Sequence, residues 1–547
     1  MSSSVLNSNE IHGSIRPAAM TRRALLQTAG AGALASGAAF GLAPAAMAQP
    51  HPAYRLEVQK AVVDVPGVEL RTYNGLVPGP TLRVDPGGDL DVILVNNLEP
   101  EPPDQFCPPI MNAFHAANTT NFHTHGLHVS PEKSADGNYD SDNVFLNVTP
   151  KAQEVPDNPH CANDDLRRGG TWYKFELPEY HPSGTFWYHA HKHGSTARQV
   201  GNGLSGPLIV NDPPGFMPSY IENAREDVFM IQLRDLTEDS SSPSKSIADL
   251  MLVLAAPEGG GFKSPTIVMR PGEVRRWRFI NAAPRSDGFI SLNVASDDPI
   301  KPELWQIAFD GITLKKRVRV NPANRGDPWD NHAALAPGNR TDFMVRIPRD
   351  SPEGELRLMA LQPALNQLHE VSEPTANELE MTIRVTGDPV DDEWSDSDEL
   401  PDPGPLLRPI SPSEIVRDRD IVFNLDSSSG TSRFMINDME FDGEVKKSFK
   451  LGTAERWQLQ NVNDFTHPFH IHVNPFFVTH IRGKELAEDD PRRRWQDTIA
   501  LPTGNADRVG EVTVLSRFVK FTGAFVIHCH ILSHEDLGMM QKVEVIA

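Results

Sequence analysis

The chain has 547 residues, of which 39% are hydrophobic and 23% are charged. At about 150 residues per domain this length predicts three or four domains, and the composition excludes a disordered or fibrous protein. The formal net charge of −22 excludes nucleic acid and an anionic membrane surface as main partners, because both recruit an excess of lysine and arginine.

The first 48 residues have the features of an export signal. Arg22 and Arg23 precede a stretch rich in alanine and glycine, and Ala46-Met47-Ala48 fits a cleavage site. The stretch is too short and too poor in leucine, isoleucine and valine to favour a bilayer crossing. We therefore expect residues 1–48 to be a twin-arginine signal peptide, with no membrane anchor and a periplasmic or secreted mature protein.

Three cysteines occur, Cys107, Cys161 and Cys529. In an oxidising compartment Cys107 and Cys161 could form a disulfide, which leaves Cys529 free.

Short apolar runs such as residues 90–95 and 512–515 are bounded by turn residues, and 47 prolines and 39 glycines supply many turns. These features favour a mostly β protein. One pattern occurs three times, a glycine followed nine residues later by an asparagine, at Gly87 and Asn96, Gly272 and Asn281, and Gly452 and Asn461. Its recurrence at domain-sized spacing predicts three β-sandwich domains of similar topology.

A second similarity links the ends of the first and third domains. Gly184 and Gly523 each lie five residues before a histidine pair, and each pair is followed by a closing apolar strand. We place the first domain at residues 50–212, the second at 213–388 and the third at 412–547. Residues 389–411 are acidic and contain prolines, so we expect a linker on the surface.

Ten of the twenty histidines fall into four short clusters, which are His123 and His125, His189 and His191, His467, His470 and His472, and His528, His530 and His534. In a strand, residues i and i+2 project from one face, so each such pair can present two imidazoles to the same point. Neutral imidazole binds copper, zinc and iron. Two pairs near each end of the chain favour metal sites over surface histidines.

The fourth cluster indicates the metal. Cys529, His534 and Met539 follow one another at intervals of five residues, and with a distant histidine they give the His2Cys set with a weak thioether that is typical of blue copper. A structural zinc site would take four strong ligands without a thioether. Because Cys529 alternates with His528 and His530 on a strand, its sulfur faces a different metal, and one covalent path joins the two sites.

With these motifs the chain resembles the three-domain multicopper oxidases, which include laccases and bacterial copper-efflux oxidases. The resemblance implies an all-β fold of three consecutive cupredoxin-like Greek-key β-sandwich domains. It also implies four copper ions, one of type 1, one of type 2 and a type 3 pair. The implied reaction is one-electron oxidation of a reducing substrate, coupled to four-electron reduction of O2 to water.

The resemblance also implies the ligand sets. The type 1 copper would be bound by His467, Cys529, His534 and Met539, with Met540 as a rival axial ligand. The type 2 copper would be bound by His123 and His470. The type 3 pair would be bound by His125, His189 and His530 on one ion and by His191, His472 and His528 on the other. Ala190 stands where the third domain has Cys529, so only one type 1 site is predicted.

Reduction of O2 to water also consumes protons. Glu535, directly after His534, and Asp136, eleven residues after His125, are similar in position to the proton-relay acids of the family. Asp140 and Asp142 are alternatives to Asp136.

The reducing substrate is open at this point. Phenols or aryl amines are one interpretation. Copper(I) in copper tolerance is the second, with Asp536 and, less securely, Asp442 on the substrate side, although a methionine-rich insert is absent. The third is a copper-free structural protein, which the presence of every ligand disfavours. We expect a monomer that meets O2 and a small-molecule or metal-ion electron donor.

Overall fold

The computed structural model describes residues 54–63, 68–155, 165–235, 246–253, 261–263, 265–285, 288–294, 299–320, 334–361, 379–428, 430–505 and 508–547. The signal peptide expected in residues 1–48 and the expected disulfide partner Cys161 lie outside this part of the chain. Cys107 is disulfide-bonded and Cys529 is free.

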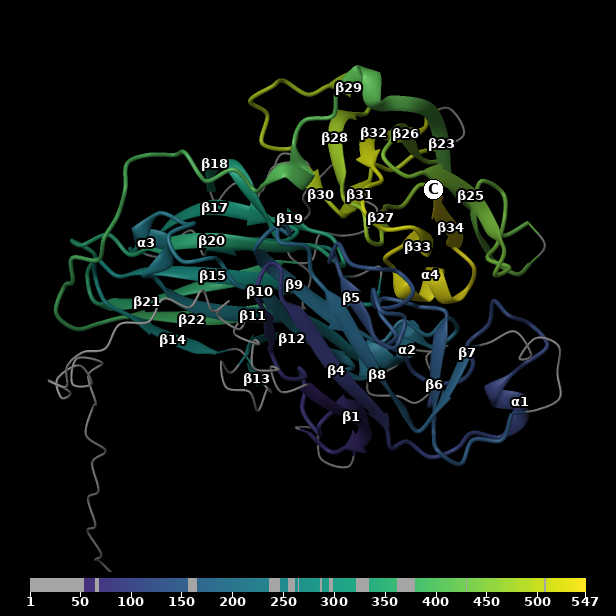
Figure 1. The fold of residues 1–547 in the computed structure, drawn as a ribbon. Coiled ribbons are helices and arrows are strands. Elements are labelled where there is room, and N and C mark those ends of the chain that lie inside the picture. The colour runs from purple at the N-terminus through teal and green to yellow at the C-terminus, as the bar shows by residue number, and fades with distance from the viewer. Residues whose placement is uncertain are drawn as a thin grey trace, which may run out of the picture. The chain divides into compact units, whose positions relative to one another are not determined.

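Strands dominate the structure, and they form three sandwiches that follow one another along the chain (Figure 1). The first contains β1 (Tyr54–Ala61), β2 (Leu70–Tyr73), β3 (Leu82–Val84), β4 (Asp89–Asn96), β5 (His123–His125), β8 (Gly170–Glu176), β9 (Gly184–His189) and β10 (Ser205–Val210). Its sheets have the strand orders β2-β1-β4-β8 and β3-β10-β9-β5. A separate two-stranded sheet pairs β6 (Leu146–Thr149) with β7 (Asp165–Arg168).

The second sandwich has the strand orders β13-β12-β11-β15-β20-β17-β18 and β14-β22-β21-β16-β19. Its strands are β11 (Arg225–Asp235), β12 (Ser246–Val253), β13 (Gly261–Lys263), β14 (Thr266–Met269), β15 (Val274–Asn281), β16 (Ile290–Val294), β17 (Glu303–Phe309), β18 (Ile312–Val320), β19 (Ala334–Leu335), β20 (Arg340–Arg346), β21 (Gly354–Leu361) and β22 (Leu379–Val385).

The third sandwich has the strand orders β24-β23-β26-β32-β28-β29, with β30 paired to β28, and β25-β34-β33-β27-β31. Its strands are β23 (Ile415–Asp426), β24 (Arg433–Ile436), β25 (Val445–Lys450), β26 (Ala454–Asn461), β27 (His467–Ile471), β28 (Phe476–Ile481), β29 (Lys484–Glu485), β30 (Trp495–Gln496), β31 (Thr498–Leu501), β32 (Gly510–Arg517), β33 (Gly523–Cys529) and β34 (Met540–Ile546).

The three sandwiches repeat the same pairing. In each, an early strand pairs in parallel with the strand that ends at the repeated asparagine, as β1 with β4, β11 with β15 and β23 with β26. In each, the closing strand pairs in parallel with an early strand of the other sheet, as β10 with β3, β22 with β14 and β34 with β25. The all-β sandwich fold expected from the sequence is therefore confirmed. The exact domain boundaries stay a prediction.

Each core lies between the two sheets of one sandwich. In the third, Trp457 and Val514 of one sheet pack with Phe469 and Phe525 of the other. Alternate residues of β4 and β32 are buried, as expected where one face of a strand is turned to the core. These cores fix the strands whose ends carry the histidines.

The repeated asparagine has the same function in all three copies. The side-chain amide of Asn96 donates to the carbonyl oxygens of Asn118 and Val148, and its side-chain oxygen accepts from the backbone N–H of Leu98. Asn281 and Asn461 make corresponding sets of three bonds. One buried side chain thus satisfies loop groups that would be costly to leave unpaired.

In the residues that the structure describes, four short helices connect the strands, α1 (Pro103–Phe106), α2 (Thr196–Asn202), α3 (Ser219–Glu222) and α4 (Leu532–Asp536), with 3-10 turns at Pro405–Leu407 and Pro412–Glu414. In the described part of the chain no helix has the length and apolarity needed to cross a membrane. The expected linker is mostly exposed. Its Leu406 and Leu407 are buried with Ile312 and Trp495, so this segment also packs against two sandwiches.

We expect Asn96→Ala to lower the free energy of unfolding by about 2–4 kcal/mol, because it leaves two buried carbonyls and one N–H without partners. The adjacent Asn97→Ala is the matched control, since Asn97 is exposed and bonds only to Glu57 through its side chain. Thermal unfolding of both variants measures the difference. Equal midpoints would contradict this function of the asparagine.

Candidate metal centre

The histidines lie on paired strands at one edge of the first and third sandwiches. His123 of β5 is opposite His189 of β9, and His470 of β27 is opposite His528 of β33. On each strand or its extension the second histidine follows two residues later, on the same face. The sequence motifs therefore become two facing sets of four imidazoles, one from each sandwich.

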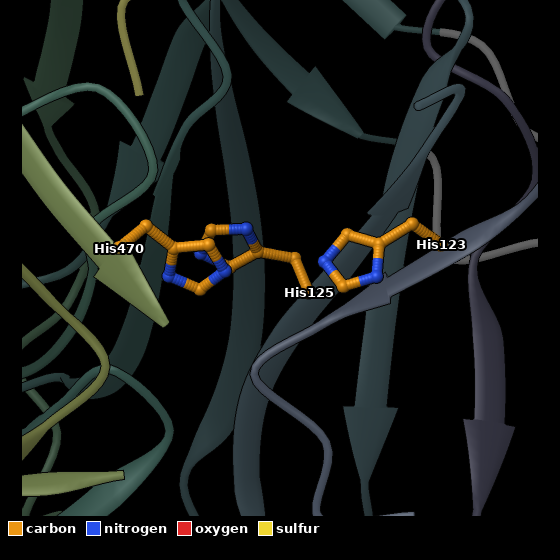
Figure 2. A group of neighbouring side chains, drawn as sticks. All are labelled: His123, His125 and His470. Atoms are coloured by element: carbon orange, nitrogen blue, oxygen red, sulfur yellow. The ribbon is translucent and has the colours of Figure 1, made fainter. Parts of the chain in front are cut away.

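These eight imidazoles meet in the interior. The ring centroids of His125 and His470 are 3.9 Å apart and the rings are nearly parallel (Figure 2). The Nε2 atom of His528 lies 3.3 Å from that of His191 and 3.2 Å from that of His472. All eight side chains are buried. The chain thus folds back on itself so that its two ends build one site.

The ring nitrogens of this cluster fit metal binding. Burial lowers the pKa of His189 to about 3 and lowers the pKa of His123 and His530 well below the usual value. These three rings are therefore neutral, and each has a lone pair free. Buried ring nitrogens without a hydrogen-bond partner belong to His123, His125, His189, His470, His472 and His530. Unpaired buried nitrogens are costly unless a metal completes them.

The donor atoms fall into groups close enough for single ions. Among the groups whose donor atoms all lie within 4.8 Å of one another are His123, His125 and His470, then His125, His189 and His530, and then His191, His472 and His528. The second and third groups are the two type 3 sets that the family resemblance implied. The first contains both implied type 2 ligands.

A second candidate site surrounds Cys529. Its sulfur lies 3.4 Å from Nδ1 of His467 and 3.8 Å from Nδ1 of His534. Burial raises the pKa of the Cys529 thiol far above its usual value, so the thiol keeps its proton until a metal displaces it. Met539 is buried in the same apolar cluster as Cys529, whereas Met540 packs in another cluster with Val526. This packing favours Met539 as the axial ligand.

Aromatic rings surround the outer side of this second site. Phe434 stacks on His534 at 4.4 Å between centroids, and Phe465 lies 4.6 Å from His467. The side-chain amide of Asn463 lies 3.0 Å from Nε2 of His467. His534 is half-buried while His467 is fully buried. The ring of His534 is therefore the more accessible of the two.

Glu535 lies beside the eight-histidine cluster. One carboxylate oxygen is 3.5 Å from Nδ1 of His191 and the other is 3.6 Å from Nδ1 of His528. Thr196 donates a hydrogen bond to Glu535. Burial, with Asp536 nearby, raises the pKa of Glu535 well above its usual value. The side chain can therefore hold a proton next to the cluster.

Among the three candidate aspartates near the first motif, Asp142 contacts the cluster. Both its carboxylate oxygens lie 3.0 Å from Nδ1 of His123, and burial raises its pKa to about 7. Asp136 is exposed and its side chain bonds within its own turn, to Ser134 and Asn138. Asp140 pairs with Arg167. These placements argue against Asp136 and favour Asp142.

Asp536 does not lie where the copper(I) interpretation placed it. Its side chain is fully buried and accepts backbone N–H groups of Gly194, Thr196 and Ala197. The carboxylate therefore holds the start of α2 against α4, and these two helices lie side by side (Figure 1). The Asp536 side chain is not exposed to a substrate. Asp442 is bonded to Lys446 and to the backbone of Glu444.

Sequence reasoning missed several neighbours of the cluster. Asp497 and Thr498 contact both His125 and His470, and Trp187 stacks on His189 at 4.3 Å. Gly338 of the second sandwich approaches so closely that a Cβ there would lie 3.1 Å from the ring of His530. Asp497, Thr498 and Gly338 lie outside the histidine motifs, so no local signal pointed to them, whereas Trp187 lies two residues before His189.

Known proteins give an independent comparison. Sequence models described as multicopper oxidase match residues 149–215 and 416–547. The chain is 26% identical to a laccase of Bacillus subtilis, over 88% of this chain and 91% of that protein. It is 25% identical to a multicopper oxidase of Staphylococcus aureus, over 86% and 83%.

Solved structures share the fold. A multicopper oxidase from Campylobacter jejuni, described as a metallo-oxidase, gives a TM-score of 0.62 at 22% identity and 90% coverage of both chains. A laccase from Pediococcus acidilactici gives 0.63 at 21% identity, covering 90% of this chain and 89% of that one. Together with the facing histidine sets, these similarities indicate a laccase-like multicopper oxidase, an oxidoreductase that uses O2 as electron acceptor.

Proposed function

We propose that this protein is a laccase-like oxidase that takes single electrons from phenols or aryl amines and reduces O2 to water. The observation that carries the proposal is the pair of buried donor sets, one around Cys529 and one of eight imidazoles, joined by a single stretch of three residues. Copper, when bound, supplies the one-electron redox chemistry and the site for O2.

We assign the type 1 copper to His467, Cys529, His534 and Met539, because their donor atoms or packing converge. We assign the type 2 copper to His123 and His470, and the type 3 pair to His125, His189 and His530 and to His191, His472 and His528. Six of these eight histidines have an unpaired buried ring nitrogen, which supports the assignment.

The chain connects the two sites by covalent bonds. Cys529 faces His467 and His534, while its neighbours His528 and His530 face the eight-histidine cluster. The thiolate and the two imidazoles are therefore separated only by the backbone of adjacent residues. Electrons can therefore pass between the two sites while the reducing substrate reacts at one and O2 at the other.

Protons are supplied to the cluster by buried acids. We propose that Glu535 delivers protons from the side of His191 and His528, and that Asp142 acts from the side of His123. Glu535 is held by Thr196 and Asp142 by the backbone N–H of Thr124. Asp142 also orients the His123 ring through Nδ1, which leaves Nε2 for a metal.

The surroundings of His534 favour an organic donor over copper(I). Phe434 and Phe465 provide apolar ring faces beside the half-buried imidazole, which suit an aromatic substrate. Asp536, the first carboxylate considered for a cation site, is buried and satisfied by backbone N–H groups. Copper(I) remains the second candidate, because a thioether is a soft ligand for copper(I) and the side chain of Met439 is exposed in the loop after β24.

We further propose that residues 1–48 direct export through the twin-arginine pathway, and that the mature protein acts as a monomer outside the cytoplasm. The domain boundaries proposed from the sequence are 50–212, 213–388 and 412–547.

Cys529→Ser should give a folded protein without the blue absorption band and without oxidase activity. The variant loses both the thiolate that produces the band and the covalent path. Absorption spectra and oxygen uptake of the copper-loaded variant test this. A retained blue band would remove Cys529 from the type 1 site.

Glu535→Gln should lower kcat by about 10²- to 10⁴-fold, as expected for loss of a positioned proton donor, while anaerobic reduction of the type 1 copper by the phenol stays as fast as in the unaltered protein. Asp136→Asn is the comparison. We expect it to leave kcat unchanged, because the Asp136 side chain is exposed and its hydrogen bonds are to Ser134 and Asn138 in its own turn. A loss of activity in Asp136→Asn equal to that in Glu535→Gln would reverse the assignment.

Oxygen uptake by the copper-loaded mature protein with a dimethoxyphenol should be rapid without added copper(II). This follows from the aromatic surroundings of His534. Uptake that begins only after copper(II) is added would instead identify copper ion as the true electron donor.

A further inference from the structure

Arg340, in the second sandwich, has a fully buried guanidinium whose five N–H donors all have acceptors. They are the carbonyl oxygens of Thr185, Gly338 and Asp310 and the two carboxylate oxygens of Asp497. The carboxylate bonds are 2.8 and 2.6 Å long and form a bidentate pair. A buried guanidinium is tolerated only when it is paired this completely.

The acceptors come from all three sandwiches. Thr185 belongs to β9 of the first, Asp310 to the turn between β17 and β18 of the second, and Asp497 precedes β31 of the third. The Asp310 carboxylate also accepts the backbone N–H groups of Asp497 and Thr498. One guanidinium therefore fixes the three sandwiches relative to one another at this point.

Asp497 connects this junction to the candidate metal ligands. Its carboxylate oxygen lies 3.3 Å from Nε2 of His125 and 3.5 Å from Nδ1 of His470, and its backbone oxygen is 2.9 Å from the same atom of His470. On each ring the other nitrogen is buried and has no partner. Contacts at one ring nitrogen decide which way the other faces.

The space around the Arg340–Asp497 ion pair is filled. A Cβ on Gly126, directly after His125, would lie 2.6 Å from a carboxylate oxygen of Asp497 and would also contact the Arg340 guanidinium. Gly126 has φ +92°, a conformation that favours glycine. Because the ion pair fills this space, a change at Arg340 must displace Asp497 or the histidine backbone.

We propose that Arg340 is a positioning residue for the type 2 copper. It holds the Asp497 carboxylate, which in turn orients His470 toward the type 2 copper and His125 toward the neighbouring type 3 ion. The second sandwich, which supplies no ligand, thereby determines the geometry of the site between the other two. This inference rests on the proposed function, since it presupposes copper at the cluster.

Arg340→Lys tests the inference, because lysine keeps the charge but cannot form the bidentate pair. We expect the type 2 copper to bind about 10- to 100-fold more weakly, the loss typical when an outer partner of a ligating histidine is removed. Chelator competition followed by electron paramagnetic resonance measures this affinity and also shows a changed type 2 signal. The blue band of the type 1 copper should stay unchanged.

Arg276→Lys is the matched control. Arg276 is also buried in the second sandwich and donates two hydrogen bonds to Asp342. We expect it to lose stability but to keep the type 2 signal and affinity. If Arg340→Lys fails to fold, Asp497→Asn is tested in its place. In that variant the Arg340 guanidinium still has a carboxylate beside it, that of Asp310 at 3.5 Å. It should weaken the type 2 copper in the same way.

The outcomes separate the inference from the proposed function. An unaltered type 2 signal and affinity in the folded variant would overturn the inference, as would an equal change in Arg276→Lys. Absence of any type 2 signal from the unaltered copper-loaded protein would instead contradict the proposed function.

Discussion

Eight imidazoles face one another in the interior of this protein, and most of the other features of the site follow from that arrangement. Water cannot satisfy their ring nitrogens, because all eight side chains are buried. Several of these nitrogens have no partner within the protein. Such a cluster lowers the stability of the folded protein when no metal is present. A bound metal pairs with these nitrogens, so metal binding stabilises the folded state.

The alternation of side chains along β33 separates the two sites while keeping them adjacent. His528 and His530 face the cluster, and Cys529 faces the opposite side with His467 and His534. A strand provides this division without any loop or special backbone geometry. The donor set around Cys529 and the eight-histidine cluster are therefore as close as two adjacent residues allow, yet they receive side chains from opposite faces of the same stretch of chain.

The residues around the cluster come from segments far apart in the sequence. Glu535 is held by Thr196 from α2, Asp142 by Thr124, and Asp497 by Arg340 from the second sandwich. Each contact fixes an acid or an imidazole in one orientation. Arg340 differs from the others because it binds all three sandwiches at once, so the assembly of the domains and the geometry of the site depend on the same side chain.

The sequence by itself determined the sandwich repeat and the residue types of the candidate ligands, because both depend on local spacing. The repeated asparagine recurs with its glycine nine residues earlier, and histidines two apart share a face of a strand. Only the tertiary structure decided which acid meets the cluster, since Asp136 is nearer to His125 in the chain than Asp142 is, yet of these two it is Asp142 that reaches His123. The structure also buried Asp536 and brought Arg340 to the site. Contacts of this kind depend on how whole sandwiches pack, and packing across domains leaves no periodic pattern in the sequence.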